Sequence, residues 1–501
     1  MFKIFPGFDL VQKMHNAKHS KRFDPRTWQK KTFGLLAVAA VFLTLWFLPT
    51  ESFGLDGLTL VQQRIIAIFV YATMMWVMEL IPAWATSVSI MGFLLLFASN
   101  SGIKWLCNPD EVGMLLNYKQ IMASFADPVI MLFIGGFILA IATTKAGLDV
   151  HLAKVLITPF GKKSENILLG FMLVTALFSM FISNTATTAM MLTFLTPVFK
   201  QLPEAGKGRI AMALSIPVAA NIGGLGTPIG TPPNTIALKY LNDPEGMNLG
   251  IGFGQWMLFM VPLVIVMIIF AWWLLKTMFP FTQKTIELKI EGEMKRGRDT
   301  RIIIVTLAIT ILLWMLDALT GINTYTVAFI PFAVFAMFGI ITRYDLEEIN
   351  WSVLWMVAGG FALGYAMNGS GLAALFVRAI PFGNFSPVLI VILSGLLCYG
   401  LSNLISHSAT AALLMPILVV VCTAMGDKLT AIGGTSTVLI GVAIASSCAM
   451  ILPISTPPNA LAYATNLVPQ KEMIKTGIII GIVGIALGYL VLFAASSLHI
   501  I

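Results

Sequence analysis

The sequence predicts an all-α polytopic membrane protein, and three observations lead to this fold class. Hydrophobic residues make up 58% of the 501 residues and charged residues only 11%, whereas a soluble globular chain carries roughly 25% charged residues. Apolar runs close to the roughly 20 residues that cross a bilayer recur along the chain. The alternating apolar and polar residues of a membrane β-barrel do not recur. Helices are therefore expected to cross the membrane.

About eleven membrane-spanning helices are expected along the chain. Two of them are interrupted by Gly, Pro, Ser and Thr, near 223–233 and near 452–458. The expected spans are 33–49, 63–82, 84–99, 128–145, 209–240, 254–278, 301–319, 325–342, 352–369, 430–466 and 474–497.

Two Ser-rich segments, 165–202 and 385–423, are each long enough for two half-length helices. Because their middles are polar, and polar backbone is tolerated at membrane depth only where protein or water satisfies it, we expect re-entrant hairpins. Each half of the chain then runs span, hairpin, broken span.

Lys and Arg predict the orientation, since cytoplasmic loops carry an excess of these residues. With the N-terminus inside, most of the 31 Lys and Arg residues fall on the cytoplasmic side. The prediction is a multi-pass protein of the cell (plasma or inner) membrane with an external C-terminus. The basic residues before the first span are expected to contact anionic lipid and not nucleic acid.

The sequence offers no support for an enzyme or an ATP-driven pump. It contains no HExxH, Walker A or dinucleotide-binding glycine pattern, and an intramembrane enzyme would need a nucleophile and base or a metal cluster. The four cysteines, Cys107, Cys398, Cys422 and Cys448, lack CxxC spacing and are expected to be small packing residues. No cofactor is predicted apart from a possible sodium ion.

One set of motifs occurs twice in the same order, which predicts an internal repeat. Broken helices in corresponding positions of two halves are the best sequence pointer to the central site of a transporter. With the orientation above, the hairpins enter from opposite sides and meet near the bilayer midplane. The first copy is Ser183-Asn184-Thr185 followed by Thr231-Pro232-Pro233-Asn234, and the second is Ser406-His407-Ser408 followed by Thr456-Pro457-Pro458-Asn459.

Each of these four motifs is expected to begin a helix. Ser, Thr and Asn cap helix N-termini, and proline is tolerated at the first helical positions. A helix N-terminus carries roughly half a positive charge, so four of them match a dianion. Hydroxyl and amide donors of the two triplets can bind two carboxylates without an Arg clamp.

These paired triplets and paired Pro-Pro-Asn breaks resemble the divalent anion/sodium symporter (DASS) family of dicarboxylate and citrate carriers. The resemblance extends from Glu79-Leu80-Ile81-Pro82 to Asn459. It implies a secondary active transporter of C4/C5 dicarboxylates (succinate, malate, fumarate, 2-oxoglutarate) that works as an elevator-type homodimer. The substrate-binding residues that it implies are Ser183, Asn184, Thr185, Thr231, Pro232, Ser406, His407, Ser408, Thr456 and Pro457.

The resemblance also implies a division of the chain into scaffold and transport domains. Residues 1–32 form the basic cytoplasmic segment, 33–127 scaffold helices, and 128–253 the first repeat, with its transport domain from about 165. Residues 254–350 form scaffold helices and a cytoplasmic loop, 351–466 the second repeat, with its transport domain from about 385, and 467–501 the last transmembrane helix.

Two sodium sites are implied by the family pattern, and the second one is altered. The first would use Ser179, Ser183, Asn184 and Gly230, all of which offer oxygen. The second would use Ser402, Ile405, His407 and Ser455, but an imidazole replaces the expected amide at His407, and histidine offers no oxygen to a hard ion. The hypothesis that follows is weaker coupling to sodium and exchange of one dicarboxylate for another.

Two alternatives stay open at this point. A sodium-coupled dicarboxylate or citrate symporter fits the same motifs. An anion channel belongs to another class and would need a continuous wet pore, whereas paired hairpins from opposite sides fit alternating access. Saturable counterflow would distinguish a carrier from a channel.

Overall fold

The computed structural model describes residues 25–103, 115–204, 206–243, 247–287, 294–379 and 385–498. Within these ranges all regular elements are helices, and the β-type pairing is limited to isolated bridges. This result confirms the prediction of an all-α fold.

The first part of the chain forms a hairpin of long helices followed by a helix that runs along one side of the molecule. Thr59 and Gln62 form a capping box that starts the second helix, and the Asp127 carboxylate caps the N-terminus of α6. The elements are α2 (Pro25–Phe47), α3 (Leu60–Met78), α4 (Ala83–Phe97), α5 (Tyr118–Ala123), α6 (Pro128–Ala146) and α7 (Leu148–Ile157).

The first hairpin and the first broken span follow. The hairpin consists of α8 (Ser164–Ser179) and α9 (Asn184–Phe194), extended by α10 (Thr196–Gln201). The broken span consists of α11 (Lys207–Gly223) and α12 (Pro232–Leu241), and α13 (Phe253–Met278) comes next. The break at 224–231 lies within the predicted interval.

The second half repeats this order. It contains α14 (Arg298–Met315), α15 (Asp317–Thr320), α16 (Thr324–Met337), α17 (Arg343–Glu347), α18 (Trp351–Gly369) and α19 (Leu372–Ala379). The second hairpin is α20 (Pro387–Leu404) and α21 (His407–Met425), and the second broken span is α22 (Gly434–Ser447) and α23 (Pro457–Ala464), before α24 (Gln470–Ser497). The break at 448–456 begins four residues earlier than predicted.

Seven helical segments in the described part of the chain are long and apolar enough to cross a membrane. They include both arms of the second hairpin, with 18 residues in α20 and 19 in α21, or about 27 and about 29 Å at 1.5 Å per residue. The prediction of half-length arms is therefore wrong for this hairpin. The apolar sequence extends to Met425, and the only helix break lies at the polar tip.

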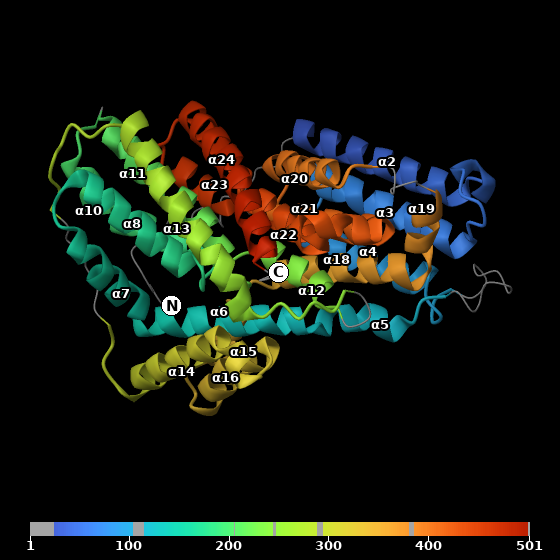
Figure 1. The fold of residues 1–501 in the computed structure, drawn as a ribbon, viewed down its shortest axis with the longest axis horizontal. Helices are drawn as coiled ribbons and strands as arrows, with labels where there is room; N and C mark the ends of the chain where they lie inside the picture. The colour runs from blue at the N-terminus through green and yellow to red at the C-terminus, as the bar shows by residue number, and fades with distance from the viewer. Residues whose placement is uncertain are drawn as a thin grey trace.

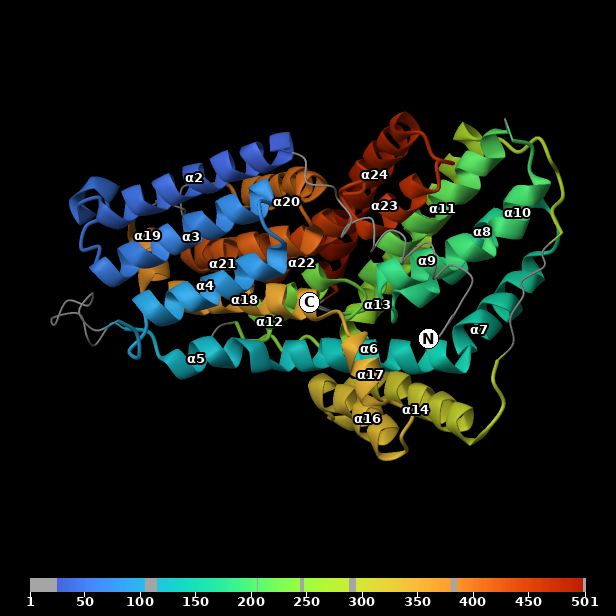
Figure 2. The same ribbon diagram turned by 180° about the vertical axis from the view of Figure 1, so that it is seen from behind.

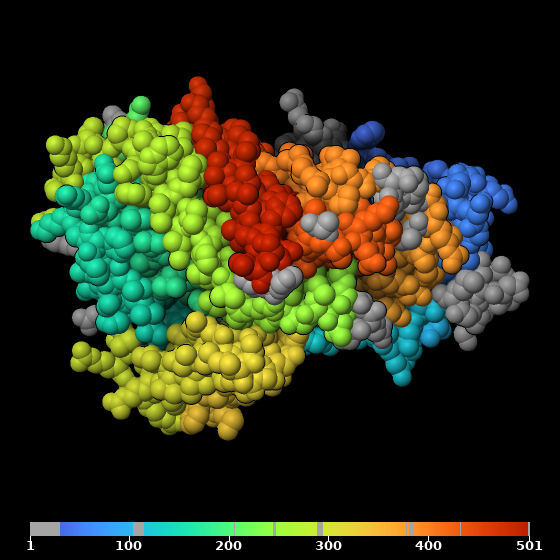
Figure 3. Space-filling model, viewed as in Figure 1, coloured from blue at the N-terminus to red at the C-terminus, as the bar shows by residue number. Residues whose placement is uncertain are grey.

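Figures 1 and 2 show two groups of helices on either side of a central region. One group contains α2, α3, α4 and α18 to α22, and the other contains α7 to α11, α13, α23 and α24. The continuous run of α5 and α6 passes along both groups, and α14 and α16 pack on α6 and project from the body in Figure 3. The two hairpins thus reach the central region from opposite directions.

Close helix packing depends on small residues at a few positions. A Cβ added to Gly135 of α6 would lie 2.2 Å from the Ala328 carbonyl oxygen of α16, and one added to Gly359 of α18 would lie 2.4 Å from Ser87 Cβ of α4. Small residues at such contacts let membrane helices approach closely. These contacts join α6 to α16 and α4 to α18.

Candidate functional site

The first hairpin turns at a short non-helical segment that ends in a capped helix. Ser183 is the N-cap of α9, and its Oγ accepts a hydrogen bond from the Ala186 N–H at 3.2 Å. Asn184 is the first helical residue. Its Oδ1 accepts from the buried Ser179 hydroxyl at 2.5 Å, while that hydroxyl also lies 2.8 Å from the Ala220 carbonyl oxygen. The tip is thereby joined to α11.

The first broken span is held open by side chains that bond its unwound backbone. The Asn234 amide donates to the carbonyls of Gly224 at 2.9 Å and Thr227 at 2.8 Å. The Thr227 hydroxyl donates to the Met180 carbonyl in the hairpin and accepts from the Gly230 N–H at 3.1 Å. These bonds satisfy backbone groups that an interrupted helix leaves unpaired, and they connect the break to the hairpin tip.

The second hairpin tip has the same capping arrangement. Ser406 is the N-cap of α21, and its Oγ accepts from the Ala409 N–H at 3.2 Å. His407 is the first helical residue, and its Nε2 lies 2.7 Å from the Ala449 carbonyl oxygen in the second break. The Ser446 hydroxyl donates to the His407 carbonyl at 3.1 Å. The imidazole therefore bonds directly to the unwound segment.

The second break is fixed by two asparagines. The Asn459 amide donates to the carbonyls of Met450 at 2.8 Å and Leu452 at 3.1 Å. Asn403 Oδ1 accepts from the Ile451 N–H at 2.9 Å, and the Ser455 hydroxyl donates to the Asn403 carbonyl at 3.1 Å. The break is thus tied both to its own helix α23 and to the hairpin helix α20.

Four helices begin in the central region, as the sequence predicts. They are α9 and α21 after the triplets, and α12 and α23 at the first proline of each Pro-Pro-Asn motif. α9 packs on α23, and α12 packs on α21, so each hairpin contacts the broken span of the other repeat. Because an N-terminus carries partial positive charge, this region offers an anion four such ends.

The predicted substrate residues lie on these four helix starts, with different exposure. Ser183, Asn184, Pro232, Ser406, His407 and Ser408 are partly exposed, Thr185 and Pro457 are exposed, and Thr231 and Thr456 are buried. Thr456 caps its helix by accepting from the Asn459 N–H at 3.1 Å, whereas Thr231 makes no such bond. Their roles in binding substrate stay predictions.

The predicted first sodium set is brought close together. Ser179 is bonded to Asn184, the Asn184 side chain lies 2.9 Å from the position of a Cβ on Gly224, and a Cβ on Gly230 would lie 2.4 Å from the Gly224 carbonyl oxygen. Hydroxyl, amide and carbonyl oxygens are ligands suited to a hard cation. The residues therefore fit a sodium ion chemically.

The residues of the altered second set are linked mainly through Ser446 and Asn403. The Ser402 hydroxyl donates to Ser446 Oγ at 3.1 Å, Ser455 bonds Asn403, and Ile405 is the buried residue before the cap. The His407 imidazole contacts the Ala449 carbonyl oxygen of the second break. No oxygen from residue 407's side chain enters this set.

Sequence reasoning missed Asn221, Asn403 and Ser446, which bond the second break and the second hairpin tip. The two asparagines could have been noticed in the sequence, since each lies in a segment expected within the membrane and a buried amide requires hydrogen-bond partners. The partners themselves lie far away in the sequence.

Two hairpins and two broken helices, arranged around one central region of helix N-termini, define a secondary membrane transporter. The chain belongs to the DASS family: the family model described as sodium:sulfate symporter transmembrane region matches residues 29–498. The members of this family and the relatives of the chain are membrane transporters and not enzymes.

The chain is similar to curated dicarboxylate carriers over most of its length. It is 29% identical to the sodium-dependent dicarboxylate transporter SdcS of Staphylococcus saprophyticus, over 90% of this chain and 89% of that one. It is also 29% identical to SdcS of Staphylococcus aureus, over 96% and 95% of the two chains. Both of these relatives are named as sodium-dependent transporters of dicarboxylate.

Solved structures of two transporters share the fold. The Alcanivorax borkumensis YdaH transporter matches 84% of this chain and 99% of its own, with a TM-score of 0.56 and 14% identity. Neisseria gonorrhoeae MtrF, described as an antimetabolite efflux pump, matches 82% and 94%, with a TM-score of 0.50 and 12% identity. At such identities the likeness concerns the fold alone.

Proposed function

We propose that this protein exchanges one C4 or C5 dicarboxylate for another across the cell membrane, with succinate, malate, fumarate and 2-oxoglutarate as candidate substrates. The observation that carries the exchange mode is the contact between His407 Nε2 and the Ala449 carbonyl oxygen at 2.7 Å. A carbonyl oxygen only accepts, so the ring nitrogen must carry a proton. A bound donor thus occupies the place where the second sodium would need an oxygen.

Weaker binding of sodium affects the step in which the carrier moves back across the membrane after it has released its substrate. Four helix N-termini that bind a dianion face each other without a counter-charge when the site is empty. A fully charged side chain at the bilayer centre costs roughly 2.5–3.5 kcal/mol or more, and the partial charges of four uncovered helix ends act in the same direction. An empty carrier that lacks a full set of sodium ions therefore crosses reluctantly, and a carrier reloaded with dicarboxylate crosses readily.

A sodium-coupled dicarboxylate or citrate symporter is the second candidate. The short distances among Ser179, Asn184, Gly224 and Gly230 support it, since their hydroxyl, amide and carbonyl oxygens would suit one hard cation. The SdcS relatives are named as sodium-dependent carriers. Sodium at the first site and exchange are compatible, because one ion can bind with substrate in both directions.

The mechanism and assembly that we propose follow the family. A transport domain built from the hairpins and broken spans moves against a scaffold in an elevator motion, within a homodimer. The N-terminus is cytoplasmic and the C-terminus external. Labelling of single cysteines placed at each end, from the outside of intact cells, tests this orientation: labelling at the N-terminal end contradicts it.

Counterflow in proteoliposomes tests the exchange mode. Vesicles loaded with unlabelled succinate in sodium-free buffer are expected to take up labelled succinate saturably, faster than vesicles loaded with buffer alone. Uptake that requires an inward sodium gradient and is not stimulated by internal dicarboxylate contradicts exchange and supports symport. Uptake that does not saturate would indicate a channel.

A panel of unlabelled competitors defines the substrate class. Succinate, malate, fumarate, 2-oxoglutarate, citrate and sulfate are each added outside the same vesicles. We expect the C4 and C5 dicarboxylates to compete. Competition by citrate or sulfate alone would contradict the proposed substrates.

A further inference from the structure

Asn221 connects the two repeats at the edge of the central region. It lies in the last turn of α11, in the first repeat, and is 2% exposed. Its Nδ2 lies 3.2 Å from Thr456 Oγ1 and 3.3 Å from Asn459 Oδ1, both at the start of α23 in the second repeat. One side chain thus reaches the break of the opposite half.

The direction of these bonds is fixed by their neighbours. Asn459 Nδ2 donates to the carbonyl oxygens of Met450 and Leu452, and carbonyl oxygens only accept. Asn459 therefore presents Oδ1 to Asn221, so Asn221 must present its NH2 group. The two amide hydrogens then serve two acceptors, one on Asn459 and one on Thr456.

The Thr456 oxygen consequently has both acceptor positions in use. It accepts from the Asn459 N–H at 3.1 Å and from Asn221 Nδ2 at 3.2 Å. A hydroxyl has two acceptor lone pairs and one donor hydrogen. In the part of the chain that the structure describes, the Thr456 hydroxyl donates to no other residue, so its hydrogen is available to a ligand.

We infer that Asn221 is a positioning residue for substrate binding: it holds the Thr456 hydroxyl as a fixed donor to a substrate carboxylate. The inference rests on the proposed function. A carboxylate accepts hydrogen bonds but does not donate them, and bonds to a charged group are stronger than neutral ones. An oxygen whose lone pairs are both occupied can meet a carboxylate only as a donor.

The first repeat lacks the equivalent bonds. Asn234, the counterpart of Asn459, has a buried Oδ1 without a hydrogen-bond partner among the described residues, and Thr231 makes no capping bond. Ser446 lies at the position in α22 that corresponds to Asn221, and its hydroxyl bonds the His407 carbonyl. The fixed donor is therefore specific to the Thr456 side of the site.

A double-mutant cycle tests the inference in the full-length protein, with counterflow of labelled succinate as the assay. The variants are Asn221→Leu, Thr456→Val and the pair of substitutions together. We expect each single variant to raise KM about tenfold, the effect of one hydrogen bond to a charged group, with a smaller change in kcat. The pair is expected to raise KM no more than Thr456→Val alone.

Asn242→Leu is the matched control. Its amide donates to the Ile251 carbonyl at 2.8 Å, beyond the outer end of α12, and KM should stay within about twofold of the unmodified protein. Asn221→Ser keeps one donor and serves where the leucine variant does not fold. Independent, multiplied effects on KM in the cycle, or a loss of kcat alone, overturn the inference.

The same assay separates this inference from the proposed function. Absence of dicarboxylate counterflow by the unmodified protein contradicts the proposed function. Normal counterflow combined with an unchanged KM in Thr456→Val overturns only the role of Asn221 and Thr456.

Discussion

Asn184 and His407 occupy the same position in the two repeats. Each is the first residue of the helix that follows a hairpin turn, and each follows a serine N-cap whose Oγ accepts from an N–H at 3.2 Å. Asn184 accepts a hydrogen bond from Ser179, whereas His407 lies with a ring nitrogen against the Ala449 carbonyl oxygen. Equivalent backbone positions thus carry an amide oxygen that accepts a hydrogen bond in one half and a ring nitrogen that donates one in the other.

Substitution His407→Asn is expected to increase sodium dependence. The amide restores an oxygen at the second site, and one additional ligand contributing about 1.4 kcal/mol corresponds to about a tenfold tighter affinity. The measurement is succinate uptake against sodium concentration in proteoliposomes. An uptake curve identical to that of the unmodified protein would contradict the assigned role of His407.

Substitution Asn184→His is expected to have the opposite effect at the first site. It removes the amide oxygen that accepts a hydrogen bond from Ser179. It also places an imidazole beside Gly224, where the Asn184 side chain is already tightly packed. Stimulation of transport by sodium should be lost, while α9 still packs against α11 and α23. Sodium-dependent stabilisation against heat measures this without transport, and unchanged stabilisation would remove Asn184 from the sodium site.

Substitution Gly230→Ala is expected to weaken sodium binding and the stimulation of transport by sodium. A Cβ at this position would lie 2.4 Å from the Gly224 carbonyl oxygen, so backbone near the predicted first sodium site must move. Gly400→Ala in α20 is the control, because no atom lies within 4 Å of its added Cβ. We expect at least about a tenfold lower sodium affinity, or about 1.4 kcal/mol, for Gly230→Ala only. Equal behaviour of the two variants would refute the close packing.

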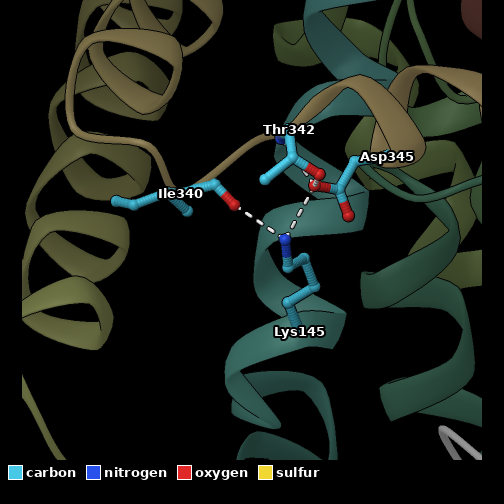
Figure 4. Close-up of polar contacts among 4 residues, drawn as sticks. All are labelled: Lys145, Ile340, Thr342 and Asp345. Atoms are coloured by element: carbon cyan, nitrogen blue, oxygen red, sulfur yellow. Dashed lines mark hydrogen bonds and ion pairs between the residues drawn. The ribbon is translucent and has the colours of Figure 1, made fainter. Parts of the chain in front are cut away.

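Lys145 and Asp345 form an ion pair that fastens the end of α6 to α17 (Figure 4). Lys145 Nζ lies 2.7 Å from Asp345 Oδ2 and 2.8 Å from the Ile340 carbonyl oxygen, and Thr342 donates its N–H and hydroxyl to the same carboxylate oxygen. Burial raises the pKa of the Asp345 carboxyl, but hydrogen bonds from Lys145 and Thr342 outweigh it and keep the pKa below its usual range.

Substitution Lys145→Met is therefore expected to lower stability by about 1 kcal/mol near neutral pH, a modest value because the lysine is partly exposed. A carboxyl with a lowered pKa stabilises the fold above its unfolded-state pKa and loses this contribution as the pH falls through the folded value. The difference in melting temperature should thus shrink in acid. Lys162→Met, which breaks an exposed pair with Glu287, should change little. A pH-independent difference would contradict the assignment.

Local sequence was sufficient for the starts of the four central helices. A serine cap before Asn184 or His407 and prolines at the first turn of α12 and α23 act within three or four residues. Composition was equally sufficient for a helical membrane fold, since apolar length sets the spans. The predicted length of the arms of the second hairpin was wrong, because a polar tip marks where a helix breaks and does not determine how far the helices on either side continue.

The amino-acid sequence alone determined that the chain is a helical membrane protein with a duplicated site, because hydropathy and helix capping are local properties. Only the tertiary structure decided that Asn221 bonds Thr456 and that His407 meets the Ala449 carbonyl. These partners lie far apart along the chain. Many other polar groups could satisfy the same side chains, and the packing of the helices determines which of them come within hydrogen-bond distance.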